Sequence, residues 1–324
     1  MLKKYDVIAL GELLIDLTQN GTSNQGNPIL EANPGGAPCN VLALLSKLGH
    51  KTAFIGKVGQ DGFGNQLHDA LVETGISTEG LCRDENVHTT LAVVHTLPDG
   101  DRDFSFYRNP GADMCLLAGE VDADLICNSQ IFHFGTLSMT DEPVRTATYE
   151  AIATAEKAGI LRSFDPNLRP PLWSSLDAAK EQVLYGMAHC DILKISDNEI
   201  QWLTGLEDFT AGIHWIQERF PQIQLILLSM GRDGSRAYSG KTMAEVPAFT
   251  GVNAIETTGA GDTFFGGILH HVLMWGLRSY TEKELKEMLT FANAAAAIIT
   301  TKKGALRVMP GEDEIRDLIS MSCG

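Results

Sequence analysis

Short apolar runs alternate with helical patterns along most of this chain, and this alternation limits the possible folds more than any other feature. The runs are typical of buried β-strands, and the segments between them have the spacing of amphipathic helices. Strands are expected at 5–10, 52–57, 131–134, 161–164, 192–195 and 225–229, and helices at 40–48, 64–74, 143–158, 176–188, 197–204, 210–219 and 283–300. The pattern predicts an α/β fold with a mainly parallel sheet that helices cover on both faces.

Two segments, residues 12–34 and 87–112, interrupt this alternation with alternating and aromatic residues. Their turn sequences are Pro98-Asp99-Gly100 and Asn109-Pro110-Gly111. The runs 90–95 and 103–107 flank the first turn as the strands of a β-hairpin do. We therefore expect a small β-sheet that leaves the main body and covers a site as a lid. No repeat or flexible linker divides the chain, so residues 1–324 are expected to form one domain.

Composition narrows the classes of partner. Hydrophobic residues make up 44% of the 324 residues, enough for a substantial core, and the formal net charge is −16. Such a negative chain is not expected to bind nucleic acid or an anionic membrane surface. The first apolar run is too short for a signal peptide and no run is long enough to span a membrane, so we expect a cytoplasmic protein.

The spacing of cysteines and histidines does not indicate a metal centre. The six cysteines include no C-x-x-C pair, so neither a disulfide framework nor a zinc cluster is expected, and most are expected to be buried thiols. His270 and His271 point to different faces of a predicted helix, which argues against joint metal binding.

A glycine-rich stretch in the last third of the chain gives the strongest indication of chemistry. It reads Glu256-Thr257-Thr258-Gly259-Ala260-Gly261-Asp262-Thr263-Phe264-Phe265-Gly266-Gly267 and leads into a helical run. Small residues let successive N–H groups point at one spot, and a helix start adds unpaired donors and a partial positive charge, all of which favour a phosphate. Asp262 adds a proton acceptor, the minimum apparatus for phosphoryl transfer to a hydroxyl. An ordinary glycine-rich helix cap is the alternative from this stretch alone.

An earlier glycine-rich element has the features of a polyol site. It reads Asn33-Pro34-Gly35-Gly36-Ala37-Pro38-Cys39-Asn40. Gly35 and Gly36 let a small polyol approach the backbone closely, and Asn40 offers both a donor and an acceptor. Asp16, after the first strand, is suited to accept bonds from two adjacent hydroxyls, at about 1.5–3 kcal/mol each. A surface acid and an ordinary turn also fit these residues.

Together, these two elements resemble the two signatures of the ribokinase-like (PfkB) carbohydrate kinases. They occur in the family's order, about 220 residues apart, and the resemblance covers essentially the whole chain, including Gly49 and Gly56. Within the family the chain is most similar to the fructokinases, on three stretches. These are Phe106-Tyr107-Arg108-Asn109-Pro110-Gly111-Ala112-Asp113-Met114, Phe164-Asp165-Pro166-Asn167-Leu168-Arg169-Pro170-Pro171-Leu172-Trp173 and Phe54-Ile55-Gly56-Lys57-Val58-Gly59. The resemblance implies a three-layer αβα sandwich that transfers the γ-phosphoryl group of ATP, bound with Mg²⁺, to the 6-hydroxyl of D-fructose.

The resemblance also implies roles for catalytic and sugar-binding residues. Asp262 matches the catalytic base, and Gly259, Ala260 and Gly261 match an anion hole for the transferring phosphoryl group. The helix start is expected to keep Asp262 ionised. The matching sugar-binding positions are Asp16, Gly35, Gly36 and Asn40, with Arg108 in the lid hairpin reaching the sugar or its phosphate and Arg169 near the sugar and phosphates.

Further positions match the nucleotide side of the family's site. They are Lys194, Ser196, Glu199, Gly231, Gly234 and Asn293. Glu199 matches an acid linked to Mg²⁺ through water, whereas Ser196 stands where the family has Asn, so that its hydroxyl would hold at most a metal-bound water. Lys194 would face the phosphates. The two glycines lie in a loop like the family's nucleotide loop, and Asn293 matches a position beside adenine.

One position departs from the family's pattern. The second signature usually begins with Asp, and this chain has Glu256. In similar enzymes that position, with the one matching Thr258, helps to hold a potassium-type ion beside a loop that matches residues 300–304. The longer side chain reshapes or abolishes such a site, so activation by K⁺ stays open.

Other functions are either disfavoured or still open on the sequence. A nicotinamide dehydrogenase needs G-x-G-x-x-G after the first strand and a P-loop kinase needs G-x-x-x-x-G-K-[ST], and neither string is present. Alternative substrates are 2-keto-3-deoxygluconate and ribose, since Arg108 suits a sugar-acid carboxylate as well as a neutral sugar. A non-catalytic sugar-binding regulator on the same fold would be expected to lose Asp262 or the glycines. An apolar, exposed lid favours a homodimer through the lid, as in similar enzymes.

Overall fold

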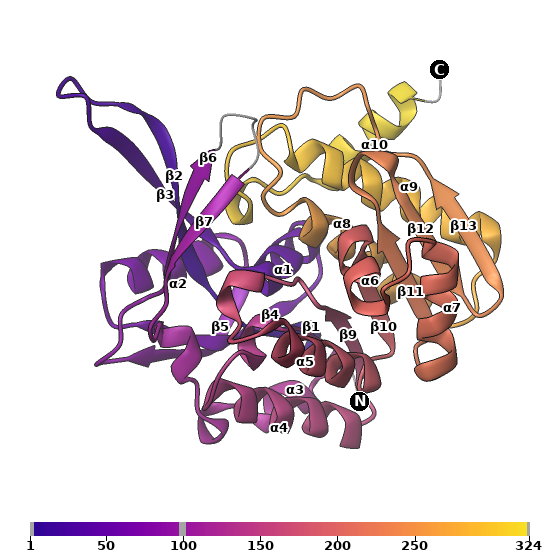
Figure 1. The fold of residues 1–324 in the computed structure, drawn as a ribbon, viewed down its shortest axis with the longest axis horizontal. Coiled ribbons are helices and arrows are strands. Elements are labelled where there is room, and N and C mark those ends of the chain that lie inside the picture. Colours follow the sequence, from indigo (N-terminus) through magenta and orange to yellow (C-terminus); the bar gives the residue numbers. More distant parts are fainter. Residues whose placement is uncertain (1–2, 97–101, 323–324) are drawn as a thin grey trace.

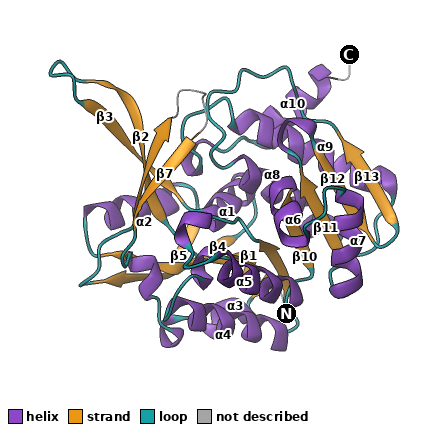
Figure 2. Cartoon of the chain, viewed as in Figure 1, coloured by secondary structure: helices purple, strands orange, loops and turns teal. Residues whose placement is uncertain are grey.

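The computed structural model describes residues 3–96 and 102–322, so the turn predicted at Pro98-Asp99-Gly100 lies outside the described residues (Figures 1 and 2). The strands are β1 (Tyr5–Leu10), β2 (Leu14–Thr22), β3 (Pro28–Gly35), β4 (Thr52–Gly59), β5 (Ile76–Asp84), β6 (Leu91–Thr96), β7 (Arg102–Tyr107), β8 (Ser129–Gly135), β9 (Leu161–Asp165), β10 (Ile192–Ser196), β11 (Leu225–Ser229), β12 (Ser235–Ser239) and β13 (Thr242–Val246). The α-helices are α1 (Ala37–Lys47), α2 (Gly62–Glu73), α3 (Ala123–Cys127), α4 (Val144–Lys157), α5 (Leu176–Ala188), α6 (Asp197–Thr204), α7 (Phe209–Arg219), α8 (Ala260–Trp275), α9 (Glu282–Ile299) and α10 (Glu312–Ser322).

The main sheet has nine strands in the order β13-β12-β11-β10-β9-β8-β1-β4-β5. The strands from β11 to β5 pair in parallel, whereas β12 and β13 are antiparallel and form one edge. All six strands expected from the sequence lie in this sheet. The predicted three-layer αβα sandwich with a mainly parallel sheet is confirmed.

Helices cover both faces of the main sheet, and alternate side chains of each strand reach the two faces. In β1, Val7 and Ala9 join the core that packs on α1, α2, α8, α9 and α10. Ile8 and Leu10 join the core that packs on α3 to α7. All four side chains are fully buried, which explains why the strand is a continuous apolar run in the sequence.

Several elements were not expected from the sequence patterns, and most of them lie at the margins of the fold. Strand β5 forms one edge of the main sheet and β13 the other, and both expose polar side chains, so neither is an apolar run. In α10 the only fully buried side chain is Ile315. The short helix α3 has only five residues.

A separate small sheet has the strand order β3-β2-β6-β7. The hairpin expected at 90–95 and 103–107 is confirmed as the antiparallel pair β6 and β7, and β2 joins β6 in parallel. In Figure 1 the hairpin of β2 and β3 extends away from the main body. The inner face of this sheet carries Leu14, Asp16 and Phe106, which line one of the two cavities of the candidate site.

The structure also bears on two further expectations, that no segment spans a membrane and that most cysteines are buried thiols. No described helix is long and apolar enough to cross a membrane. The five cysteines within the described residues are free thiols; Cys39 and Cys190 are buried and the other three are half-buried, so the expectation that most are buried was too strong. Cys323 lies outside the described residues.

Polar residues gather at the carboxyl ends of the central strands. Asp165 ends β9 and Ser196 ends β10, while Glu12 follows β1 and Gly231 follows β11. Ligands of open α/β sheets bind at this edge, so the fold places the candidate site residues where such sheets bind ligands.

Candidate functional site

The centre of the site is the first turn of α8. Gly259 precedes the helix with a φ of 76°, a left-handed conformation that favours glycine. A Cβ at Gly259 would also lie 2.8 Å from the Cβ of Ala305. The first N–H groups of a helix have no intrahelical acceptor; here the N–H of Ala260 instead donates to the carbonyl of Thr257 (3.2 Å). This leaves Gly259 and Gly261 as the better placed of the three predicted anion-hole amides.

Asp262 lies in the first turn of α8 and is 8% exposed. Its Oδ2 accepts a hydrogen bond from Asn40 Nδ2 at 2.8 Å. Burial raises the pKa of Asp262 above its ordinary value, although the bond from Asn40 and the positive charges of Lys194 and Arg169 act in the opposite direction. Desolvation thus outweighs these stabilising effects on the pKa, and the expectation that the helix start keeps this carboxylate ionised stays a prediction.

Two cavities meet beside Asp262. The first has a volume of about 530 Å³, and the second about 650 Å³. Asp262, Asp16 and Asn40 line the first cavity, whereas Glu199 and Asn293 line the second. The residues common to both walls are Asn167, Arg169, Lys194, Ala260 and Gly261. Two molecules bound in these cavities would thus come together at the start of α8.

Three of the predicted polyol residues, Asp16, Gly36 and Asn40, line the first cavity, and Gly35 lies against Asp16. Asp16 is on β2, and a side chain at Gly35 on β3 would overlap its Oδ2. Gly36 has a φ of 134°, and a side chain there would overlap the carbonyl oxygen of Glu12. Asn40, on α1, donates to Asp262, and its Oδ1 is buried with no hydrogen-bond partner in the described structure. An unsatisfied buried acceptor of this kind is available to a ligand hydroxyl.

Arg108 does not line either cavity. It is 5% exposed, and its Nε pairs with Asp113 Oδ2 at 2.7 Å. Its two terminal nitrogens donate to Leu137 O (2.9 Å) and Thr140 Oγ1 (3.0 Å). The expectation that Arg108 reaches the sugar or its phosphate is therefore corrected: the guanidinium group is held by neighbouring residues that the sequence pattern gave no reason to consider, and it supports the wall at Leu137.

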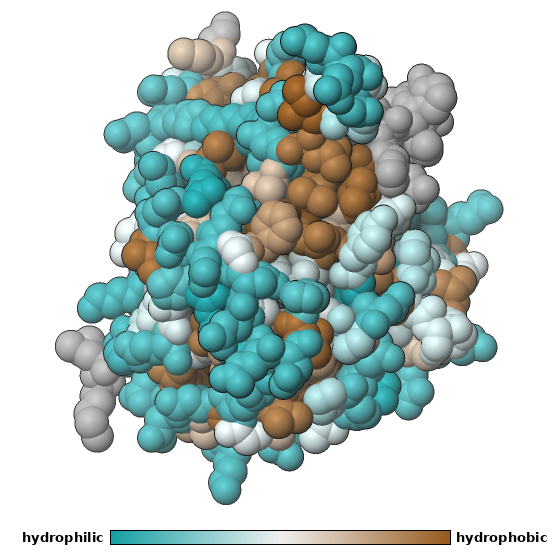
Figure 3. Space-filling model, turned by 90° about the vertical axis from the view of Figure 1, so that its left-hand side faces the viewer, coloured by the Kyte–Doolittle hydropathy of each residue, from teal (hydrophilic) through white to brown (hydrophobic). Residues whose placement is uncertain are grey.

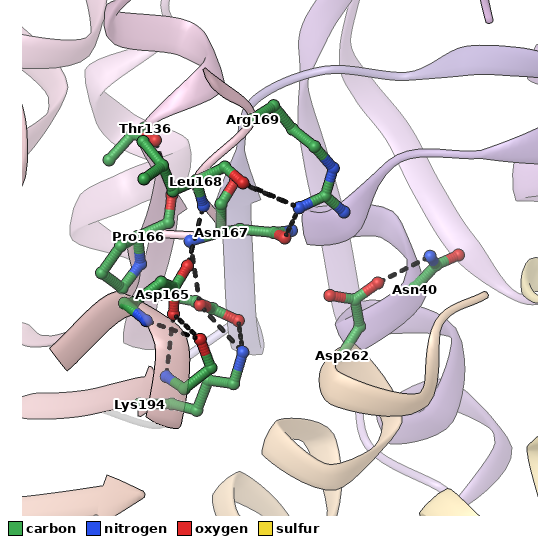
Figure 4. Close-up of polar contacts among 11 residues, drawn as sticks. Asn40, Thr136, Asp165, Pro166, Asn167, Leu168, Arg169, Lys194 and Asp262 are labelled. Atoms are coloured by element: carbon green, nitrogen blue, oxygen red, sulfur yellow. Dashed lines mark hydrogen bonds and ion pairs between the residues drawn. The ribbon is translucent and has the colours of Figure 1, made fainter. Parts of the chain in front are cut away.

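Lys194 and Arg169 bring positive charge to the junction of the cavities (Figure 4). Lys194 Nζ pairs with Asp165 Oδ2 at 2.9 Å, and a Cβ at Gly261 would lie 3.3 Å from this Nζ. Burial would lower the pKa of Lys194, but the charge of Asp165 raises it. Arg169 Nη1 donates to Asn167 Oδ1 at 2.7 Å. Figure 4 shows the Asp262 carboxylate and the Arg169 guanidinium group on facing sides of this junction.

Glu199 and Ser196 form the start of α6 on the wall of the second cavity. Ser196 and Glu199 cap each other reciprocally, and Glu199 Oε1 also accepts from Leu168 N at 2.8 Å. Burial would raise the pKa of Glu199, but the charge of Lys194 and the donors of Leu168 and Ser196 lower it. The carboxylate is therefore ionised and fixed. No group of three or more His, Cys, Asp or Glu side chains suited to a metal ion occurs in the part of the chain that is described.

The far wall of the second cavity combines small and apolar residues. Gly231 and Gly234 both have positive φ, 53° and 99°, and the short 3₁₀ turn between them lies at the carboxyl end of the sheet. Asn293 accepts from Ser235 Oγ (2.8 Å) and donates to Val246 O (3.2 Å). Ala296 lies on the same wall and leaves room for a flat ring.

Glu256 and Thr258 lie together, but their polar groups are occupied. Thr258 Oγ1 donates to Glu256 Oε1 at 2.7 Å, and Gly304 N donates to Glu256 Oε2 at 3.1 Å. The carboxylate thus links the loop before α8 to residues 300–304. Because each carboxylate oxygen already accepts a hydrogen bond, a monovalent cation would compete with these donors for Glu256, so the residues do not favour an ion site as they stand.

The sequence patterns assign no role to several wall residues. Glu12 and Phe106 line the first cavity, Trp202 lines the second, and Asn167 lines both, while Asp165 holds Lys194. An acid directly after a buried strand was the signal available for Glu12. Asp165 and Asn167 lie in the Phe164-to-Trp173 stretch, where only the resemblance drew attention to them.

Comparison with known proteins gives one consistent family. The pfkB family carbohydrate kinase profile matches residues 4–311. The chain is 41% identical over 316 residues to Fructokinase-2 of Oryza sativa subsp. japonica, covering 97% of this chain and 94% of that one. A fructokinase of Xylella fastidiosa with bound ATP superposes with a TM-score of 0.88 at 30% identity, covering 98% and 99% of the two chains. A fructokinase double mutant of Vibrio cholerae O395, bound to fructose, ADP and a potassium ion, superposes with a TM-score of 0.86 at 27% identity, covering 98% and 100%.

Proposed function

This chain belongs to the pfkB family of carbohydrate kinases, and we propose that it transfers the γ-phosphoryl group of ATP to the 6-hydroxyl of D-fructose, giving fructose 6-phosphate and ADP. The observation that carries the proposal is the meeting of two cavities at the start of α8, with Asp262 on the wall of the first. Fructose would occupy the first cavity and ATP the second.

Asp262 is proposed as the general base. Its Oδ2 accepts from Asn40, which orients the carboxylate and leaves Oδ1 for the proton of the sugar hydroxyl. The raised pKa makes Asp262 a stronger base than an exposed aspartate. As the proton moves to Asp262, the bond between the sugar oxygen and the γ-phosphorus forms, and the bond to the β,γ-bridging oxygen breaks.

The charge of the transferring group would be stabilised by donors on both sides of the junction. The N–H groups of Gly259 and Gly261 lie at the helix start, and one such preorganised donor typically contributes about 10²–10³-fold to the rate. Lys194 and Arg169 add positive charge beside them. Asp165 is proposed to position Lys194 for this purpose.

Mg²⁺ is the divalent ion we propose for the nucleotide. Mg²⁺ prefers oxygen ligands and keeps several waters, which suits Glu199, an ionised carboxylate fixed on the wall of the second cavity. Glu199 would hold the ion through water, and the ion would neutralise charge on the terminal phosphates.

We derive no step through a potassium-type ion. The oxygens of Glu256 already accept from Thr258 and Gly304. Initial rates in potassium chloride and in choline chloride at equal ionic strength are expected to agree, and strong activation by potassium would contradict this assignment.

A neutral sugar fits the first cavity better than a sugar acid. The positive side chains on the wall of the first cavity are Arg169, Lys194 and Arg232. They belong to segments that also line the second cavity or adjoin it, so they lie at the nucleotide end. The sugar end carries Glu12 and Asp16, and Arg108 is held by Asp113. Among the described wall residues, the carboxylate of 2-keto-3-deoxygluconate would therefore lie beside acidic side chains at the sugar end and be repelled by them. ATP turnover against a panel of fructose, ribose and 2-keto-3-deoxygluconate tests this order.

The same assay separates an enzyme from a sugar-binding regulator. The catalytic set of Asp262 and the two glycines is present, so ADP formation is expected to depend on fructose and to yield fructose 6-phosphate in equal amount. Binding of fructose without any ADP formation would favour the regulator.

We also propose that residues 1–324 act as one domain, with the small sheet closing over the sugar as a lid. The expected cytoplasmic location stays a prediction.

The outer face of the lid is proposed to join two copies of the chain. The strand registers place Leu17, Leu30, Ala32, Leu91, Val93 and Tyr107 on that face. Leu30 is 43% exposed and Tyr107 66% exposed. In Figure 3 apolar side chains form a continuous area on the side of the molecule that carries the lid. Sedimentation should give a dimer for the natural chain and a monomer for Leu30→Asp; a natural chain that sediments as a monomer would refute the proposal.

A further inference from the structure

The sugar cavity contains a second carboxyl group for which the proposed mechanism has no use. Glu12 follows β1, is 4% exposed, and lines the first cavity with Asp16, Gly36 and Asn40. An acid is rarely buried to this extent without a partner or a function.

Half of this carboxyl group has a structural explanation. Glu12 Oε1 accepts a hydrogen bond from Ala37 N at 2.7 Å. Ala37 is the first residue of α1, and Gly36 before it offers no side-chain cap. A carboxylate at a helix N-terminus satisfies an unpaired donor and is favoured by the helix dipole. Glu12 therefore fixes the turn that brings Gly36 and Asn40 to the cavity.

The second carboxyl oxygen of Glu12 has no such structural explanation. Within the described structure, Ala37 N–H is the only hydrogen bond that Glu12 receives from another residue. Arg108 is the nearby positive charge that would compensate Glu12, and it is already paired with Asp113. The pKa of Glu12 is raised to about 7, mainly by burial; the charge of Asp113 also raises it, whereas the backbone donors of Glu12 and Ala37 and the charge of Arg108 lower it. Keeping an acid here costs stability, and helix capping accounts for one oxygen only.

We propose that Glu12 is a sugar-binding residue, whose second carboxyl oxygen bonds a hydroxyl of the hexose beside the hydroxyls that Asp16 holds. This assignment rests on the proposed function, because it places the sugar in the first cavity. Glu12 then has two roles, since one oxygen positions the Gly36 turn and the other contacts the ligand. Two acids at the sugar end also discriminate against sugar acids by like-charge repulsion and desolvation.

The test uses Glu12→Gln in the full-length chain. Glutamine keeps the shape and the carbonyl acceptor for Ala37 N–H, and it loses the carboxylate that faces the cavity. Losing the charge on one hydrogen bond is expected to raise the KM for fructose by about fivefold to tenfold, while the KM for ATP stays unchanged and the thermal midpoint stays the same or rises. Glu79→Gln, which changes an exposed acid paired with Lys4, is the matched control and should leave both KM values unchanged.

Monodeoxy analogues of fructose identify the bond itself. The analogue that lacks the contacted hydroxyl should bind the natural chain weakly, and its affinity should not fall further in Glu12→Gln. Each of the other analogues should lose as much affinity in the variant as fructose does. The assignment would be overturned by an unchanged KM for fructose in Glu12→Gln. It would also be overturned if every analogue lost the same affinity between the natural chain and the variant. If the natural chain phosphorylates another neutral sugar and not fructose, the proposed function fails, and the same comparison with that sugar still decides the role of Glu12.

Discussion

Replacing Asp262 by asparagine tests the centre of the mechanism. Asparagine has nearly the same volume, and its carbonyl oxygen can still accept the bond from Asn40 Nδ2, which is 2.8 Å long in the natural chain. The cavity walls and the sugar site are therefore expected to persist, and only the proton acceptor is lost.

The size of the effect follows from what the carboxylate contributes. A positioned general base is worth typically about 10²–10⁴-fold, so kcat should fall by at least about 10²-fold, or roughly 2.7 kcal/mol of activation free energy. Fructose binding should change little, because Asp16, Asn40 and the two glycines are untouched. Since burial raises the pKa of Asp262, its ionised form destabilises the folded state at neutral pH, and Asp262→Asn should melt at the same temperature or higher.

The assay couples ADP formation to a spectrophotometric readout over a range of fructose concentrations, with fructose binding and thermal midpoint measured in parallel. In the natural chain kcat/KM should rise with pH as Asp262 loses its proton, and the variant should lack this rise. Normal turnover in the variant would remove Asp262 from the mechanism. A loss of activity accompanied by a lower melting temperature would point to misfolding and would refute the expectation that the cavity walls persist without the carboxylate.

Three further perturbations test other parts of the structure. Asp16→Ala should raise the KM for fructose by about tenfold or more through loss of charged hydrogen bonds, and steady-state kinetics with an unchanged KM would show that the sugar lies elsewhere. Arg108→Met leaves Asp113 buried and unpaired, so urea denaturation should show a loss of about 3–5 kcal/mol, against about 0–1 kcal/mol for Arg145→Met at an exposed ion pair. Burial lowers the pKa of His133 to about 3 from an unfolded value near 6.5, so its contribution to stability is present above pH 6.5 and is lost as the pH falls toward 3, at about 1.4 kcal/mol per pH unit. Urea midpoints of His133→Gln should lack this part of the pH dependence, and equal slopes for both proteins would contradict it.

The sequence predicted the main sheet well because a strand buried on both faces must be apolar throughout. β1 and β11 have the bounds expected for them, and α5 and α6 also match. Helix α1 begins at Ala37 and not at residue 40, because Pro38 is tolerated in a first helical turn. Edge strands such as β5 escaped prediction since one side of them faces solvent.

The site was predictable where chemistry resides in a local motif and unpredictable where it depends on long-range contacts. The glycines around Asp262 are adjacent in the sequence, so their shared role was visible there. The raised pKa of Asp262 arises from burial by the folded chain, which no motif records. Arg108 was assigned to the sugar because nothing in the sequence showed that Asp113 and Leu137 would hold its nitrogens.

The attachment of the small sheet to the main body has a mechanical consequence. Asp113 accepts bonds from Thr90, just before β6, and from Arg108, just after β7, and Arg108 in turn donates to the carbonyl of Leu137. Rotation of the small sheet against the main sheet would strain this chain of bonds and move the cavity wall at Leu137. Any force applied to the outer surface of that sheet would therefore be transmitted to the sugar, and the filling of the cavity would in turn set the tilt of the sheet.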